Sequence, residues 1–218
     1  SAAEIVAQLW RVNQDGHNIS RIVFMGMGEP LLNYDNVMEA IEWITSEKGF
    51  GISKRKITVS TAGYIKGVQR LIKDKQYLNL AFSVGHADAI KRVKFMPIEK
   101  RNPFPEIVKT IQEYQSLHNR KLTLEYTLLE GKNEDEQAIQ DLIAVAKFLK
   151  AKINLINLNP HPKIPFKPVS EKVIHRAKDQ IQAAKVPVTV RFRKGQDISA
   201  ACGQLGESIL KDALKKPE

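Results

Sequence analysis

The chain is poor in cysteine, and this scarcity limits the chemistry available to it. Its 218 residues include a single cysteine, Cys202. One thiol excludes a disulfide within the chain and any metal site made of cysteines alone. His161 and His175 are candidate ligands by residue type, but neither has a second ligand at coordinating spacing. We therefore predict no metal-binding residue in this chain.

Long apolar segments are also missing. No part of the sequence approaches the roughly 20 consecutive apolar residues that span a membrane. Residues 1–12 do not form a secretory signal, because Glu4 and Arg11 interrupt what is otherwise an amphipathic helix pattern. With 43% hydrophobic residues, the chain has enough apolar material for one large domain. We expect a single domain over residues 1–218 that does not contact membranes, is monomeric, and is cytoplasmic.

Negative charge is in short supply relative to positive charge. The 34 lysines and arginines outnumber the 24 acidic residues, which gives a formal net charge of +10. This surplus suits a polyanionic partner such as RNA or DNA. The basic residues gather at 54–56, 91–94, 100–101 and 191–194. No cluster is interleaved with the aromatic residues of a base-stacking platform, so charge on solvated helix faces remains the alternative.

Apolar periodicity predicts six strands that alternate with helices. The expected strands are 22–25, 56–60, 78–84, 122–129, 152–159 and 186–192. The expected helices are 2–13, 65–72, 105–118, 135–149 and 198–214. Two more helices are expected after their caps, one after Asn36 or Asp35 and one from Ser170 to residue 184. Strands and helices in alternation indicate right-handed βαβ units around a parallel sheet, which makes this an α/β fold. A barrel or open barrel is favoured over a doubly wound sheet, although periodicity alone leaves both open.

The loops that follow the predicted strands are rich in glycine and polar residues. In such folds these loops lie at one edge of the sheet, where ligands bind. The first loop contains Gly28 and Glu29 directly after the apolar residues 22–25, which we expect to form a buried strand. Glycines let a ligand approach the backbone, and Glu29 adds a carboxylate. From spacing alone, a simple glycine turn with a solvated glutamate stays open.

Five segments occur in a recognisable order: FMGMGEPLLNYDNV, GFGISKRKITVSTAG, the MPI of residues 96–98, KINLINLNP and DISAACGQL. Together they resemble the radical S-adenosylmethionine methyltransferases of the RlmN/Cfr type, over residues 21–205. The resemblance implies a partial (β/α) barrel with about six parallel strands and outer helices. It also implies methylation of carbon 2 or carbon 8 of an adenine in 23S rRNA, with tRNA as a further substrate of the RlmN enzymes. We expect the carbon 2 activity, although the sequence does not separate the two.

The resemblance assigns roles to individual residues. Gly28 and Glu29 match the pair that binds the methionyl amino group of S-adenosylmethionine, because a carboxylate attracts an ammonium group. Ser60 and Asn159 match residues that contact this cofactor. Without the resemblance, Asn159 before a proline would equally suit a strand terminator.

Cys202 matches the cysteine that first receives a methyl group. The adenine carbon is electrophilic, so ordinary methyl transfer has no nucleophile to use, whereas a soft thiolate accepts the methyl for later radical activation. Alone, a cysteine at the start of a predicted helix would more often be a small buried residue.

A third group of matching residues shows a departure. Ser83 matches the start of an SLHA motif, but residues 83–87 read SVGHA. Either one residue is inserted before His86 or Gly85 replaces the histidine. Ser83, Gly85 and His86 are therefore all candidate cofactor-binding residues, with the last two uncertain by one position.

The larger departure is the absence of the family's CxxxCxxC loop, whose three thiolates hold a [4Fe–4S] cluster. A second, redox-active cysteine is also missing. The chain thus resembles the part of such an enzyme that follows the cluster loop, with the first strand and N-terminal part absent. The alternative is a relative without a cluster that acts as an RNA-binding or regulatory protein. In either case we predict that this chain alone binds no cluster and methylates no RNA.

Overall fold

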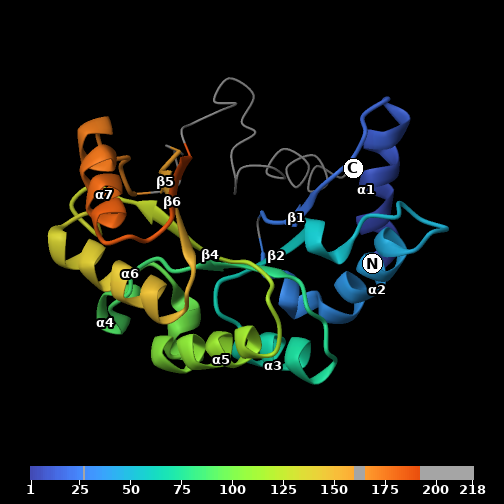
Figure 1. The fold of residues 1–218 in the computed structure, drawn as a ribbon, viewed down its shortest axis with the longest axis horizontal. Helices are drawn as coiled ribbons and strands as arrows, with labels where there is room; N and C mark the ends of the chain where they lie inside the picture. The colour runs from blue at the N-terminus through green and yellow to red at the C-terminus, as the bar shows by residue number, and fades with distance from the viewer. Residues whose placement is uncertain (27, 160–164, 192–218) are drawn as a thin grey trace, which may run out of the picture.

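A six-stranded parallel sheet organises the molecule (Figure 1). The computed structural model describes residues 1–26, 28–159 and 165–191. The strands lie side by side in chain order, each hydrogen-bonded to the next. They are β1 (Ile22–Phe24), β2 (Ile57–Thr61), β3 (Asn79–Ser83), β4 (Leu122–Leu128), β5 (Lys152–Asn157) and β6 (Val188–Arg191). This unshuffled order confirms the predicted open barrel, because a doubly wound sheet would reverse its strand order.

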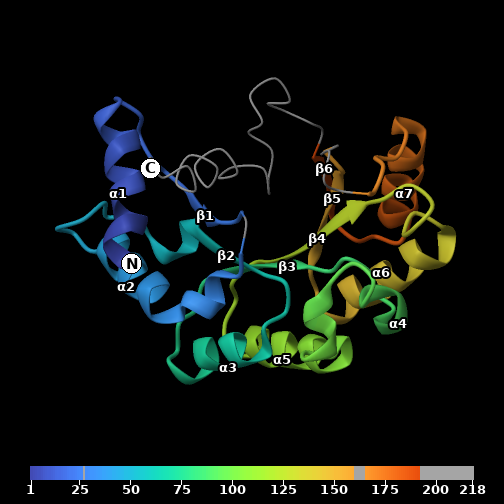
Figure 2. The same ribbon diagram turned by 180° about the vertical axis from the view of Figure 1, so that it is seen from behind.

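Helices connect the strands and cover the outer side of the curved sheet, as Figures 1 and 2 show. They are α1 (Ala2–Gln14), α2 (Tyr34–Thr45), α3 (Ile65–Lys73), α4 (Ala89–Arg92), α5 (Phe104–Ser116), α6 (Glu136–Phe148) and α7 (Glu171–Ala183). Short 3-10 turns lie at Pro30–Asn33, Lys54–Lys56 and Pro97–Lys100. The short α4 was not predicted from the sequence. No helix in the described ranges is both long and apolar enough to cross a membrane.

The core fills the space between the sheet and these helices. Alternate strand residues point outward into it and are almost fully buried: Ile57, Val59, Leu80, Phe82, Leu124, Tyr126, Ile153 and Leu155. Phe82 lies against Phe104 of α5, with ring centroids 6.0 Å apart. Because side chains alternate along a strand, the residues between them point to the inner, concave face. The described helices lie on the opposite side of the sheet (Figures 1 and 2), so this face is the candidate for receiving a ligand.

Two local expectations were wrong. The strand expected to be buried, β1, leaves Val23 52% exposed, because β1 lies at the sheet edge and pairs only with β2 among the described residues. Neither Asn36 nor Asp35 caps α2, which begins at Tyr34 after the 3-10 turn Pro30–Asn33.

The ends of the later helices differ less from expectation. Ser170 is at the N-cap of α7, but its side chain makes no capping hydrogen bond. The helix expected at 198–214 lies outside the described residues, and so does Cys202.

Candidate functional site

Glu29 lies at the edge of the sheet where the parallel strands end, and neighbouring loops hold its carboxylate. Oε2 accepts hydrogen bonds from the Ala62 amide at 2.7 Å and the Thr61 hydroxyl at 3.2 Å. Oε1 accepts one from the Leu31 amide at 3.3 Å. Burial raises the pKa of Glu29 above its usual range, although these three donors oppose the shift. The carboxylate is therefore oriented and half-buried, unlike that of a solvated turn.

The backbone beside Glu29 suits close approach by a ligand. Gly28 has a φ of +95°, a conformation that side-chain-bearing residues rarely adopt, and a Cβ there would meet no atom within 4 Å. A hollow of about 420 Å³ opens next to this loop, between α1, β1 and the start of α2. Its lining includes Ile5 and Leu9 as well as Gly28 and Glu29. A ligand in this hollow would meet one oriented carboxylate on a largely apolar wall.

A buried arginine ties together the loops that follow β2 and β3. Arg92 is fully buried; its Nη2 donates to the Ala62 carbonyl at 2.6 Å, and its Nε donates to the Val84 carbonyl at 2.8 Å. Its Nη1 pairs with Glu99, whose other oxygen accepts from the Phe104 amide at 2.8 Å. Because Ala62 also donates to Glu29, one connected network fixes all three loops.

This role of Arg92 was missed in the sequence, where the residue belongs to a surface-like basic cluster at 91–94. Arg92 is buried rather than exposed because a carboxylate and further acceptors surround its guanidinium. Some of these partners come from residues far away in the chain. Burial lowers the pKa of Arg92, and Glu99 opposes this shift. Nothing in the local sequence distinguishes Arg92 from the neighbouring lysines.

Ser83 is the last residue of β3 and lies on the concave face. Gly85 and His86, whose match to the family motif is uncertain by one position, lie in the loop that follows. Gly85 has a φ of +68°, and a Cβ there would lie 2.7 Å from Cγ of Met96. His86 is fully buried; its Nδ1 accepts from the Asp88 amide at 3.0 Å, so Nε2 carries the proton of the neutral ring. Burial lowers the pKa of His86, and Nε2 has no hydrogen-bond partner in the described part of the chain.

Ser60 and Asn159 complete the predicted set. Ser60 lies on the concave face of β2, half-buried. Asn159 follows β5, and its Oδ1 is buried without a hydrogen-bond partner among the described residues. Leaving such an acceptor unpaired costs about 1–3 kcal/mol. Asn157, by contrast, pairs through both amide atoms with the backbone of Val169. Asn157 is therefore structural, whereas the buried Oδ1 of Asn159 keeps an unused capacity to accept a hydrogen bond.

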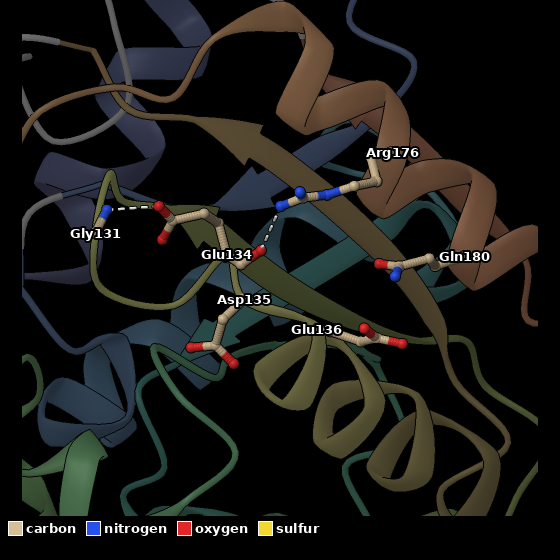
Figure 3. A pocket seen from close by; sticks show the side chains of 6 residues that line it. All are labelled: Gly131, Glu134, Asp135, Glu136, Arg176 and Gln180. Atoms are coloured by element: carbon tan, nitrogen blue, oxygen red, sulfur yellow. Dashed lines mark hydrogen bonds between the residues drawn. The ribbon is translucent and has the colours of Figure 1, made fainter.

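A second hollow, of about 500 Å³, contains none of the predicted residues (Figure 3). It lies between the loop after β4 and the helices α6 and α7. The Glu134 carboxylate there accepts from the amides of Gly131, Lys132 and Asn133 at 2.5 to 3.2 Å, and Arg176 donates to the Glu134 carbonyl. The backbone donors of this loop are thus already occupied by a side chain of the same loop, which leaves the smaller hollow beside Glu29 as the better candidate.

Comparison with known proteins shows which proteins the chain resembles. No family model matches the chain. Over 206 residues it is 38% identical to a probable dual-specificity RNA methyltransferase RlmN of Akkermansia muciniphila, covering 94% of the chain and 57% of that protein. Over 228 residues it is 37% identical to the dual-specificity RNA methyltransferase RlmN of Pseudomonas fluorescens, covering 100% of the chain and 59% of that protein.

Solved structures agree. A radical SAM methyltransferase from Sphaerobacter thermophilus superposes with a TM-score of 0.88 at 35% identity, covering 94% of the chain and 61% of that structure. Over this part of their length, the chain is similar to the RlmN-type radical SAM methyltransferases. A domain of a pyruvate-formate lyase-activating enzyme from Bacteroides vulgatus, at 20% identity and a TM-score of 0.59, shares the fold. The chain spans about three fifths of the length of the RlmN relatives it matches.

The residues present fit one of the two cofactors of radical SAM enzymes. The oriented Glu29 carboxylate and the unpaired Oδ1 of Asn159 suit the amino group and other donors of S-adenosylmethionine. A [4Fe–4S] cluster does not fit, because the sequence has one cysteine where three thiolates are needed. In the described ranges, no group of three His, Cys, Asp or Glu side chains is placed to hold a metal ion.

Proposed function

We propose that this chain is the cofactor-binding part of a radical SAM methyltransferase that methylates carbon 2 of an adenine in 23S rRNA, with tRNA as a second substrate. The single observation that carries the proposal is Glu29, a half-buried carboxylate that three donors orient at the ligand-binding edge of the sheet. The names of the RlmN relatives support an RNA substrate, and the net charge of +10 suits one.

The residues at this edge bind different groups of S-adenosylmethionine. Glu29 receives the ammonium group, and Gly28 lets the backbone approach it. Ser60, Ser83 and the free oxygen of Asn159 offer hydrogen bonds to the remaining polar groups. When bound, the cofactor supplies the methyl group and the radical chemistry. Gly85 and His86 shape the loop that follows Ser83.

Cys202 is the proposed methyl acceptor. Its thiolate is the one soft nucleophile that the sequence offers. The single domain over residues 1–218, the monomeric state and the cytoplasmic location remain predictions.

Purified chain tests the proposal. We expect wild-type chain to bind S-adenosylmethionine in isothermal titration calorimetry. After incubation with iron and sulfide, we expect no visible absorption of a [4Fe–4S] cluster and no methylated RNA. Cluster absorption at normal stoichiometry, together with methylation, would refute the predicted inactivity. Failure of the folded wild-type chain to bind S-adenosylmethionine would refute the role given to Glu29.

The coding sequence upstream of Ser1 separates the enzyme from the alternative. A CxxxCxxC motif there supports the methyltransferase, and its absence supports a relative without a cluster that binds RNA. In the protein that carries the motif, mass spectrometry of digested 23S rRNA would distinguish 2-methyladenosine from 8-methyladenosine. Cys202→Ala should abolish either product, and continued methylation by this variant would disprove transfer through the cysteine.

A further inference from the structure

A row of polar side chains crosses the concave face of the sheet at the height of Ser83. Ser83 pairs in register with Glu125 of β4, Glu125 with Asn154 of β5, and Asn154 with Thr189 of β6. Residues in register on parallel strands point to the same face at the spacing of neighbouring strands, about 4.8 Å. Four strands therefore contribute a continuous polar row next to a predicted cofactor-binding serine.

Hydrogen bonds fix the orientation of this row. The Thr189 hydroxyl donates to Oδ1 of Asn154 at 2.9 Å, and Nδ2 of Asn154 donates to Oε2 of Glu125 at 2.8 Å. Since both ends of the Asn154 amide are engaged, the amide cannot flip without losing both bonds. The row thus holds one oxygen of Glu125 in place and leaves the other to face its surroundings.

Glu125 is unusually placed for a carboxylate. Its side chain is buried, with 9% of the residue exposed. No described residue donates a hydrogen bond to its Oε1. The charges of Arg191 and Lys152 favour its ionised form, but burial outweighs them and raises its pKa. Burying a carboxylate that accepts one hydrogen bond from a described side chain, that of Asn154, costs free energy. A ligand that donates to the other oxygen would offset part of this cost.

The chemistry of the row limits the kinds of ligand that can bind there. An ionised carboxylate accepts hydrogen bonds and repels anions, so a phosphate group is a poor occupant. A neutral group with several donors is a good one. Adenosine carries an exocyclic amine and ribose hydroxyls, and it occurs both in S-adenosylmethionine and in the target nucleotide of the proposed reaction.

We infer that Glu125, oriented by Asn154 and Thr189, accepts a hydrogen bond from an adenosine that binds against the concave face beside Ser83. The inference rests on the proposed function, because that function brings an adenosine to this face. The adenosine belongs either to the cofactor or to the RNA, and binding measurements separate the two sources.

The test compares Glu125→Gln with wild type for three probes: S-adenosylmethionine, 5′-methylthioadenosine and a single-stranded RNA oligonucleotide that contains adenosine. The glutamine has the same shape but turns an amide donor or a weaker acceptor toward the ligand. We expect a loss of roughly 10- to 100-fold in affinity, as for other hydrogen bonds to charged groups. Weaker binding of the first two probes assigns the cofactor adenosine, and weaker binding of the oligonucleotide alone assigns the RNA.

Glu130→Gln is the matched control, since Glu130 lies exposed on the loop after the same strand and loses the same charge. It should bind all three probes as wild type does. Thr189→Val, which removes the far end of the row, should weaken the same probe as Glu125→Gln but by a smaller factor. Glu29→Gln should weaken the binding of S-adenosylmethionine and leave that of 5′-methylthioadenosine unchanged, because the latter lacks the methionyl amino group that Glu29 is proposed to bind.

Thermal unfolding at pH 7 supplies the second readout. Because burial disfavours the charge, Glu125→Gln should melt at the same temperature as wild type or higher. A variant that melts lower would show that the carboxylate holds the fold and would overturn the inference. A variant that binds every probe as wild type does would overturn it as well. If wild type binds none of the probes, the proposed function itself fails.

Discussion

The two faces of the sheet are made from adjacent residues but serve different ends. Phe82 points outward, fully buried against Phe104 of α5. Ser83, the next residue, points inward to the polar row that leads to Glu125. The strand period of two separates these tasks so cleanly that neighbours in sequence contribute to different properties. Stability resides mainly on the outer face, and ligand chemistry is available on the inner one.

The sharpest test of this comparison substitutes two adjacent residues of β3, one on each face. Phe82→Ala should lower the free energy of unfolding by about 3–5 kcal/mol, because it leaves a large cavity in the core. Ser83→Ala should change it by less than about 0.5 kcal/mol, since its side chain makes no hydrogen bond to another described residue. Urea denaturation followed by circular dichroism measures both. Equal losses at the two positions would show that the faces do not differ as described.

Arg92 belongs to neither face and connects the loops above them, so its effect should be somewhat smaller. Arg92→Met keeps the apolar stem near Phe82 and Phe104 but leaves Glu99 and the carbonyls of Ala62 and Val84 without their partner. We expect a loss of about 3 kcal/mol in unfolding free energy.

The same variant should bind S-adenosylmethionine more weakly, because Ala62 helps to orient Glu29. Lys94→Met, an exposed position nearby, serves as the control and should change neither quantity. Normal affinity in a folded Arg92→Met protein would show that the network does not position the binding loop.

The smallest effect on stability concerns Glu29. Its folded pKa lies above the ordinary value of 4.5, so the protonated form favours folding. This contribution is present below pH 4.5 and is lost as pH rises through the folded pKa. Glu29→Gln should therefore be as stable as wild type at pH 7, or more stable.

Cofactor affinity should change in the opposite direction with pH. The ammonium group needs an ionised partner, so wild-type affinity should fall as the solution is acidified through the raised pKa of Glu29. Glu29→Gln should bind about 10-fold more weakly at pH 7, with a flat pH profile. Calorimetric titrations between pH 5 and 8 would reveal the difference, and parallel profiles for both proteins would exclude Glu29 as the ammonium-binding group.

Much of the fold could be predicted from local pattern. The six strands and the helices between them, except the short α4, were expected within a few residues, because apolar periodicity reports which side of an element is buried. The failures have physical causes. Val23 was expected to be buried because residues 22–25 are all apolar. The exposure of a side chain on an edge strand, however, depends on which elements pack beside that strand. The expected caps of α2 failed because the helix begins at Tyr34, directly after the 3-10 turn, so Asp35 and Asn36 lie within its first turn.

The candidate site could be predicted only in part. Gly28, Glu29, Ser60, Ser83 and Asn159 were predicted because they lie in motifs that match a family. All five lie in strands or in the loops that follow them. The structure adds the feature that distinguishes Asn159 from Asn157, namely which amide oxygen lacks a partner. No sequence pattern carries that information, because both asparagines belong to the same short segment.

The sequence by itself determined the kind and order of the elements, since these follow from interactions between residues close together in the chain. It also determined the scarcity of thiolates, which is a matter of composition. The tertiary structure alone decided that Arg92 is buried and bound to a carbonyl 30 residues away. It alone placed Ser83, Glu125, Asn154 and Thr189 in one row. Register between strands depends on how distant segments pack, and this is why a polar row across four strands is invisible until the chain is folded.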